Sequence, residues 1–292
     1  MSSGFSSLHP ALTFTYFMLI IVIAMLFMHP LYLSTILLAT ILINLFMDSG
    51  EALKSNLKFY LIMAIVIMIL NPIFSQQGST ILLYFRDRPV TLEAAIYGVL
   101  FALLLLNILI TFLAYNQVIT SDRFLFLFAS VAPKTAFNLT VVLRFIPLMK
   151  RRLQDITAVQ KAMGGIAPKT TSQRAREAMQ TLNILVTWSL EAALQTAVSM
   201  RARGYGLGQR SSAVIYPFEK RDLYWLIFLS LTGGASLAGA FLGYGQFEVY
   251  PHLGSFGPVM SWHYLAVLLF LSAPIYIEGK ECLQWRIIRS RI

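Results

Sequence analysis

The chain has 292 residues and a net charge of +10, with 57% hydrophobic residues and only 12% charged residues. A soluble domain carries about a quarter charged residues, so this chain has too little polar surface to cover a globule in water. The composition excludes an ordinary soluble protein and indicates a protein surrounded by lipid.

The N-terminal region, residues 1–115, contains four segments that are apolar enough to span a membrane: Leu12–Met28, Leu31–Met47, Phe59–Phe74 and Ala94–Tyr115. About 20 helical residues cross a hydrocarbon core of ~30 Å, so the first three are at or below the lower limit. His29-Pro30 predicts either a tight turn between two helices or a kink in one bent element. Met1–Pro10 has no lysine or arginine, so we expect the first apolar segment to be retained rather than cleaved as a signal peptide.

The central segment, Asn116–Asp222, is too long for a loop and too apolar for a disordered linker, and its apolar spacing predicts helices. The first predicted helix covers Phe124–Val131. A second apolar run, Phe137–Ile146, carries Arg144, and an arginine at membrane depth costs about 3 kcal/mol. This cost favours a helix at the membrane surface, or packed on its neighbours, over a seventh span.

Two longer helices are predicted next. An amphipathic helix runs from Leu148 to Gly164-Gly165, and glycine is typical of a helix C-terminus. A third helix runs from Arg174 to Arg203. Between Glu177 and Arg201 its only charge is Glu191, so we expect it to be nearly buried on all faces. Packing within the chain and packing against a membrane partner would both explain this.

The two long helices end alike, one with Lys161-Ala162-Met163-Gly164 and the other with Arg201-Ala202-Arg203-Gly204. Each ending has a basic residue, alanine, one variable position and glycine. The last carbonyls leave about half a negative charge at a helix C-terminus, which stabilises a cation there. An arginine in this position can also make several directed hydrogen bonds to a partner. From spacing alone, a cation that only complements the helix dipole is the alternative interpretation.

The C-terminal region, residues 223–292, adds two predicted spans, Leu223–Tyr244 and Val259–Ile277, and a basic tail. Lysine and arginine are retained on the cytoplasmic side of a membrane. They gather in the central segment and the tail, whereas Gly245–Pro258 has none, so we expect both termini and the central segment to be cytoplasmic. Arg86 and Arg88 are the exceptions, placed outside with Asp87 and Glu93 as available partners. The positive charge therefore reflects membrane topology.

Several motifs of other function classes are missing from the sequence. There is no phosphate-binding loop of the type Gly-x-x-x-x-Gly-Lys-Ser/Thr, no metal-ligand spacing among the four histidines and no recognisable nucleophile motif. The single cysteine, Cys282, excludes a disulfide framework within the chain. No soluble basic domain with interleaved aromatic residues is present to bind nucleic acid. We therefore expect no catalytic residues, metal site or cofactor, and no nucleic-acid partner.

Three ordered pieces carry a family resemblance: Leu143-Arg144-Phe145-Ile146-Pro147, Gln160-Lys161-Ala162-Met163-Gly164 and Met200-Arg201-Ala202-Arg203-Gly204-Tyr205-Gly206. With His9-Pro10 before the first span, and with the number and order of spans, they resemble the transmembrane T component of energy-coupling factor (ECF) transporters, the EcfT/CbiQ family. The likeness covers essentially the whole chain. It implies an all-α polytopic membrane protein with about six transmembrane helices and a cytoplasmic coupling-helix domain.

The resemblance also implies partners and a function. In this family the T component joins two ABC-type ATPases to a substrate-binding membrane subunit, the S component, for uptake of a vitamin or a transition-metal ion across the bacterial inner membrane. Two coupling helices each end in Ala-Arg-Gly, whose arginine docks in one ATPase. The second motif is intact at Ala202, Arg203 and Gly204, whereas Met163 replaces arginine in the first. The expected ATPase-binding residues are Arg203, Ala202, Gly204, Arg201, Lys161, Ala162, Met163 and Gly164.

Two other functions remain open from the sequence. A stand-alone permease would transport without any ATPase, and no span centre carries the charged residue that an ion-coupled carrier normally uses. A membrane-embedded enzyme acting on lipid would be active without partners, and the missing catalytic motifs argue against it. The coupling component, with ATP hydrolysis in partner subunits, is the favoured prediction.

Overall fold

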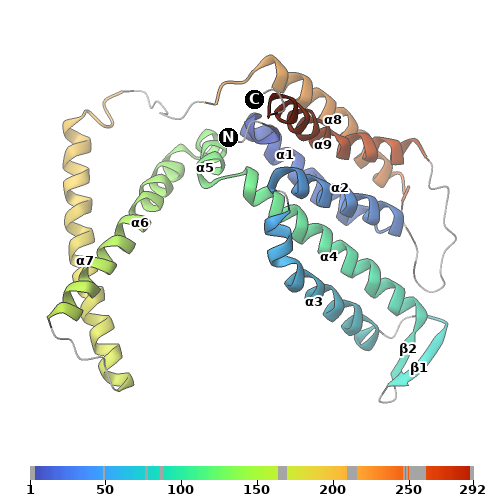
Figure 1. Cartoon of the computed structure of the whole chain (residues 1–292), viewed down its shortest axis with the longest axis horizontal. Coiled ribbons are helices and arrows are strands. Elements are labelled where there is room, and N and C mark those ends of the chain that lie inside the picture. The colour runs from blue at the N-terminus through green and yellow to red at the C-terminus, as the bar shows by residue number, and fades with distance from the viewer. Residues whose placement is uncertain are drawn as a thin grey trace. The chain divides into compact units, whose positions relative to one another are not determined.

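The computed structural model describes residues 4–48, 50–75, 78–85, 88–163, 170–208, 216–245, 247, 249 and 261–289. These residues are helical almost throughout, which confirms the all-α prediction (Figure 1). Five of the helices are long and apolar enough to cross a bilayer, so the chain is a multi-pass membrane protein. The chain divides into a membrane unit, residues 1–123 and 216–292, and an inserted unit, residues 124–215.

In the described part of the membrane unit, a 3₁₀ turn at Phe5–Ser7 is followed by α1 (Pro10–Leu26), α2 (Pro30–Asp48), α3 (Glu51–Phe74), α4 (Leu92–Val118), α8 (Lys220–Phe241) and α9 (Trp262–Arg289). These helices correspond to the six apolar segments of the sequence. α1 has 17 residues, at the lower end of the range of about 17–25 for a span, and is the shortest. α3 starts at Glu51, well before the predicted Phe59, and its early lysines can extend their charges toward water.

α1 and α2 are separate helices joined by a turn, the first of the two alternatives for His29-Pro30. His9 and His29 cap the helices that follow them in the same way. His9 Nδ1 accepts a hydrogen bond from the N–H of Ala11, and His29 Nδ1 accepts one from the N–H of Leu31, each at 3.2 Å. The proline after each histidine lacks an N–H that would need a partner at a helix start. Burial lowers the pKa of His29, whose side chain lies in the turn.

Five helices of the membrane unit pack in a closed series, in which α4 contacts α2, α2 contacts α9, α9 contacts α8, α8 contacts α1 and α1 contacts α4. Aromatic side chains fill the space between them: Tyr16 stacks on Phe270 at 5.0 Å and meets Phe5 edge-on at 5.2 Å. α3 lies outside this series and packs mainly along α4 (Figure 1). Only 11% of its span is buried, so α3 exposes the most apolar surface of the five candidate spans.

Both ends of the membrane unit lie on one face, which we call the terminal face. The N–H of Phe5 donates to Glu278 Oε1 at 2.7 Å, which ties the N-terminal turn to α9. Arg221 Nη2, at the start of α8, donates to the carbonyl of Ser7 at 3.4 Å. The guanidinium of Arg123 lies 6.0 Å from the centre of the Tyr216 ring, where the chain leaves and re-enters the membrane unit.

A two-stranded antiparallel hairpin, β1 (Ile81–Phe85) and β2 (Arg88–Thr91), connects α3 to α4. The hairpin was not predicted from the sequence. The buried carboxylate of Glu93 accepts hydrogen bonds from Ser79 Oγ at 3.0 Å and from the N–H of Thr80 at 3.2 Å. Glu93 therefore anchors the loop before the hairpin. It was expected, with Asp87, to be available to Arg86 and Arg88, but Arg86 and Asp87 lie outside the described residues.

The inserted unit contains most of α5 (Ser121–Val131), then α6 (Pro133–Ala162) and α7 (Thr171–Ala202). The prediction of a helix over Phe124–Val131 is confirmed. The prediction of a separate helix that begins at Leu148 is wrong, because α6 continues from the run Phe137–Ile146 through Pro147 without interruption. A proline inside a helix removes only one backbone hydrogen bond and often leaves a bend instead of an end. The hydrogen bonds on either side keep the two predicted segments in one helix.

The prediction that the third long helix is nearly buried on all faces is also wrong within this chain. Of the residues in α7, only Thr181 is buried. The low charge of the helix had suggested an interior position. Its apolar side chains are instead exposed, so packing within the described chain does not explain its composition.

Candidate partner-binding surface

The variable positions of the repeated ending have equivalent backbone geometry. Met163 follows α6 as its C-cap with φ −76° and ψ 11°, and its N–H donates to the carbonyl of Val159 at 2.9 Å. Arg203 follows α7 with φ −82° and ψ 6°, and its N–H donates to the carbonyl of Ser199 at 3.1 Å. The two endings are thus similar in backbone conformation as well as in sequence. The side chains of Met163 and Arg203 leave their helices at the same point of the last turn.

Gly204 closes α7 in a left-handed conformation, with φ +78°. Its N–H donates to the carbonyl of Arg201 at 3.0 Å, and the N–H of Tyr205 donates to the carbonyl of Met200 at 3.0 Å. This pair of bonds is a Schellman motif, which ends a helix sharply and favours glycine at the left-handed position. Gly164, the predicted counterpart at the end of α6, lies outside the described residues.

The described residues of both endings are accessible. Lys161, Ala162 and Met163 at the end of α6 are exposed, as are Arg201, Ala202 and Arg203 at the end of α7, and Gly204 is half-buried. Met163 is 83% exposed, an unusual position for an apolar side chain. Among the described residues, none of the three cations forms an ion pair. Their hydrogen-bonding groups are therefore available to a partner.

α6 and α7 cross in antiparallel directions. Gln160 of α6 and Thr181 of α7 are joined by a hydrogen bond of 3.3 Å. The guanidinium of Arg152, earlier in α6, lies 5.5 Å from the centre of the Trp188 ring, later in α7. The end of α6 therefore lies near the first third of α7. Because a helix rises ~1.5 Å per residue, the two endings are about 40 Å apart along the pair.

A further exposed surface runs along α7. Six apolar side chains recur every three or four residues, which places them along one side of the helix. Each is between 53% and 69% exposed: Met179, Leu182, Val186, Leu190, Leu194 and Val198. An apolar strip of this length on a monomer is typical of a protein or membrane contact.

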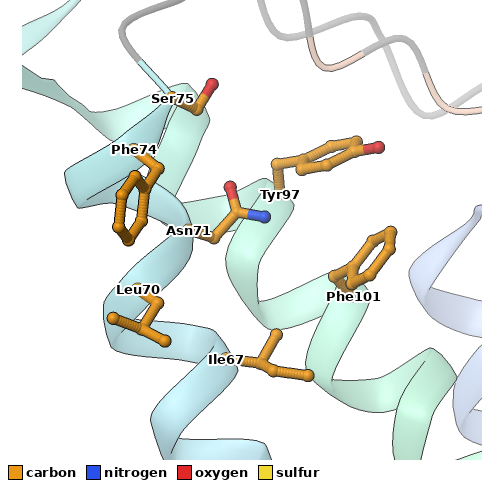
Figure 2. A pocket seen from close by; sticks show the side chains of 7 residues that line it. All are labelled: Ile67, Leu70, Asn71, Phe74, Ser75, Tyr97 and Phe101. Atoms are coloured by element: carbon orange, nitrogen blue, oxygen red, sulfur yellow. The ribbon is translucent and has the colours of Figure 1, made fainter.

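The membrane unit has an open groove of about 550 Å³ between α3 and α4. Figure 2 shows its lining: Ile67, Leu70, Asn71, Phe74, Ser75, Tyr97 and Phe101. This lining holds no carboxylate, imidazole or thiol, so it lacks the groups most used for acid–base or metal catalysis. Within the described residues, no cluster of three or more histidine, cysteine or acidic side chains could hold a metal ion.

No protein-family model matches this chain. No curated protein matches it either.

The two endings can be found in the sequence, but the contacts that hold α6 against α7 cannot. Arg152 and Trp188 are in different helices, and neither belongs to a recognisable motif. A tryptophan in a helix with little charge was the available signal, because a ring of this kind attracts a nearby cation. Arg152 is one of three consecutive basic residues. Which of the three meets Trp188 depends on how the two helices cross, and the spacing of residues in the sequence does not show this.

Proposed function

We propose that this chain is the transmembrane coupling component of an ECF-type importer. It transmits the ATP-driven motion of two ABC-type ATPases to a substrate-binding S component, for uptake of a vitamin or a transition-metal ion. The chain itself is not an enzyme, and ATP hydrolysis belongs to the ATPases. The observation that carries the proposal is the pair of exposed, equivalently capped endings on two long crossed helices.

The geometry of the inserted unit suits such a role. Closure of two ATPases is a rigid-body motion, and it is transmitted best by stiff elements that each subunit holds at a defined point. α6 and α7 have 30 and 32 residues, and their endings are far enough apart to contact two different subunits. The apolar strip of α7 supplies a surface for the S component in the membrane.

The packing of the terminal face supports the proposed orientation in a bacterial inner membrane. The N-terminal turn, the two attachment points of the inserted unit and the end of α9 gather on that face, together with Lys220 and Arg221. Positive residues mark the cytoplasmic side. Both termini and the inserted unit are then cytoplasmic. Two termini on the same side require an even number of membrane crossings, so α1 joins the five longer helices as a sixth span.

The two ATPase contacts are not chemically equal. At the end of α7, Arg203 can enter a groove and make several directed hydrogen bonds. At the end of α6, Met163 offers a flexible thioether that fills an irregular apolar pocket, and Lys161 offers a charge two residues earlier. Apolar packing by Met163 with charge from Lys161 replaces the arginine contact.

The test is purification of the chain from membranes that co-express the candidate ATPase pair. Wild type is expected to retain both ATPases, and Arg203→Glu is expected to release at least one while remaining folded. Arg176→Glu is the matched control, because it reverses an exposed charge near the opposite end of the same helix. A wild-type chain that retains neither ATPase, or an Arg203→Glu variant that retains both, contradicts the proposal.

Lys161→Glu tests the other ending separately. If Lys161 supplies the charge at the end of α6, its reversal also weakens retention of the ATPases. Full retention by this variant would show that the α6 contact does not depend on Lys161, without affecting the result for Arg203.

A further inference from the structure

Two asparagines join α2 and α4 by reciprocal hydrogen bonds. Asn44 Nδ2 of α2 donates to the carbonyl of Ile110 in α4 at 3.2 Å, and Asn107 Nδ2 of α4 donates to the carbonyl of Leu33 in α2 at 3.0 Å. Each amide nitrogen also donates to a carbonyl one turn earlier in its own helix, at 2.9 Å. Both side-chain N–H groups of each asparagine are therefore used.

Three oxygens beside these bonds are buried without a hydrogen-bond partner among the described residues: Asn44 Oδ1, Asn107 Oδ1 and Thr111 Oγ1. Their residues are at most 1% exposed. Asn107 and Thr111 are one turn apart on the same side of α4, and Asn44 contacts the carbonyl of Ile110, which precedes Thr111. All three residues belong to the contact between α2 and α4, which we call the α2–α4 seam.

Thr111 differs from other buried helical threonines of the chain. The hydroxyl of Thr232 donates to the carbonyl of Phe228 at 2.7 Å, and that of Thr40 donates to the carbonyl of Leu37 at 3.0 Å. A threonine in a helix usually satisfies its hydroxyl in this way. The hydroxyl of Thr111 has no such partner among the described residues, and an unmade hydrogen bond in a buried position is costly.

The chemistry of the seam selects the ligand. An asparagine Oδ1 only accepts hydrogen bonds, while the hydroxyl of Thr111 both donates and accepts. Water donates two hydrogen bonds and accepts two, so it can donate to the amide oxygens and accept from the hydroxyl. Buried water typically makes about three bonds to groups that lack other partners. An ion is disfavoured, because none of the three oxygens carries the negative charge that would offset its loss of hydration.

We propose that internal water occupies the α2–α4 seam beside Ile110, donating to Asn44 Oδ1 and accepting from the Thr111 hydroxyl. This water completes the polar contact that the two asparagines begin, and it fixes α2 against α4 within the membrane unit. The proposal is independent of the transport function.

The test compares Thr111→Val with Thr232→Val in the purified full-length chain. Valine has nearly the shape of threonine, so each variant removes a hydroxyl and leaves the packing intact. If water is bound, Thr111→Val removes one of its hydrogen-bond partners. We then expect the melting temperature to be about 2–4 °C lower than that of Thr232→Val. If the seam is dry, Thr111→Val removes an unsatisfied polar group and is at least as stable as the control.

A density map of the wild-type protein at a resolution that shows water provides the second measurement. A peak within hydrogen-bonding distance of Thr111 Oγ1 and of Asn44 Oδ1, together with the lower melting temperature of Thr111→Val, supports the proposal. Either a map without that peak, or a Thr111→Val variant at least as stable as Thr232→Val, overturns it.

Discussion

Met163 and Arg203 occupy the same C-cap position at the ends of two crossed helices, with φ and ψ angles that differ by only a few degrees. Arg203 forms no ion pair with the described residues, and both side chains are exposed. An exchange of side chain at either position therefore needs no change of backbone. This equivalence allows the two proposed ATPase contacts to be altered one at a time.

Met163→Arg is expected to strengthen the proposed ATPase contact at the end of α6. An arginine in this position can make directed hydrogen bonds that methionine cannot, and the helix C-terminus favours its charge. We expect the co-purified ATPases to remain bound to the variant at higher salt than to wild type. Val131→Arg adds the same charge at an exposed apolar residue of α5, outside both endings and the apolar strip, and controls for nonspecific attraction. Equal salt sensitivity of Met163→Arg and wild type would contradict the prediction.

Gly204→Ala is expected to loosen the end of α7. A residue with a Cβ pays about 1–2 kcal/mol in the left-handed conformation that Gly204 adopts. The space itself is available, because an added Cβ would only touch Leu207 at 3.5 Å, so the cost comes from the backbone. Hydrogen exchange at Gly204 and Tyr205 should become faster. Gly208→Ala, where an added Cβ meets nothing within 4 Å, should leave these amides unchanged.

Gly239→Ala is expected to destabilise the membrane unit by about 1–3 kcal/mol, the usual cost of overpacking a core. An added Cβ on this residue of α8 would overlap the imidazole of His263, which is fully buried. Gly234→Ala on the same helix adds a Cβ that meets nothing within 4 Å. It should be neutral or slightly stabilising, because alanine favours helix more than glycine does. Thermal unfolding in detergent separates the two, and equal melting temperatures would argue against this packing.

Acidification is expected to reduce stability through His29. Burial lowers its folded-state pKa, so below about pH 6.5 the unfolded chain binds a proton that the folded chain does not. The contribution of the neutral ring to the free energy of unfolding is fully present above that pH, and it is lost as the pH falls toward the folded-state pKa. His29→Asn keeps a side-chain acceptor suited to a helix start but does not titrate. Its melting temperature should fall less than that of wild type between pH 7.5 and 5.5, and parallel curves would exclude His29 as the cause.

The sequence predicted helices best where apolar periodicity and glycine stops agree. α7 begins three residues before the predicted Arg174, and its C-cap is the predicted last residue, Arg203. Pro147 was misread because a proline signals either an end or a bend, and only the hydrogen bonds on both sides decide between them. The hairpin at Ile81–Thr91 was missed because it is short and adjoins long apolar helices, whose composition dominated the interpretation of that region.

The candidate site was partly predictable for a related reason. Lys161 and Arg203 are at helix ends, and local signals such as a following glycine mark a helix end in sequence. Burial is a property of the whole fold, so the low charge of α7 could not show whether its apolar side chains face the chain or a partner. The unpartnered oxygen of Thr111 was beyond prediction because the sequence does not show which rotamer a threonine adopts.

The close approach of Arg123 and Tyr216 bears on whether the inserted unit can be replaced by another segment. Arg123 is the last residue before the inserted unit and Tyr216 the first after it, and the two lie close together within the membrane unit. The closed series of α1, α2, α4, α8 and α9 does not depend on the inserted unit for its own contacts. We therefore expect that a short linker, or the corresponding segment of another chain, can replace residues 124–215 while the membrane helices keep their neighbours.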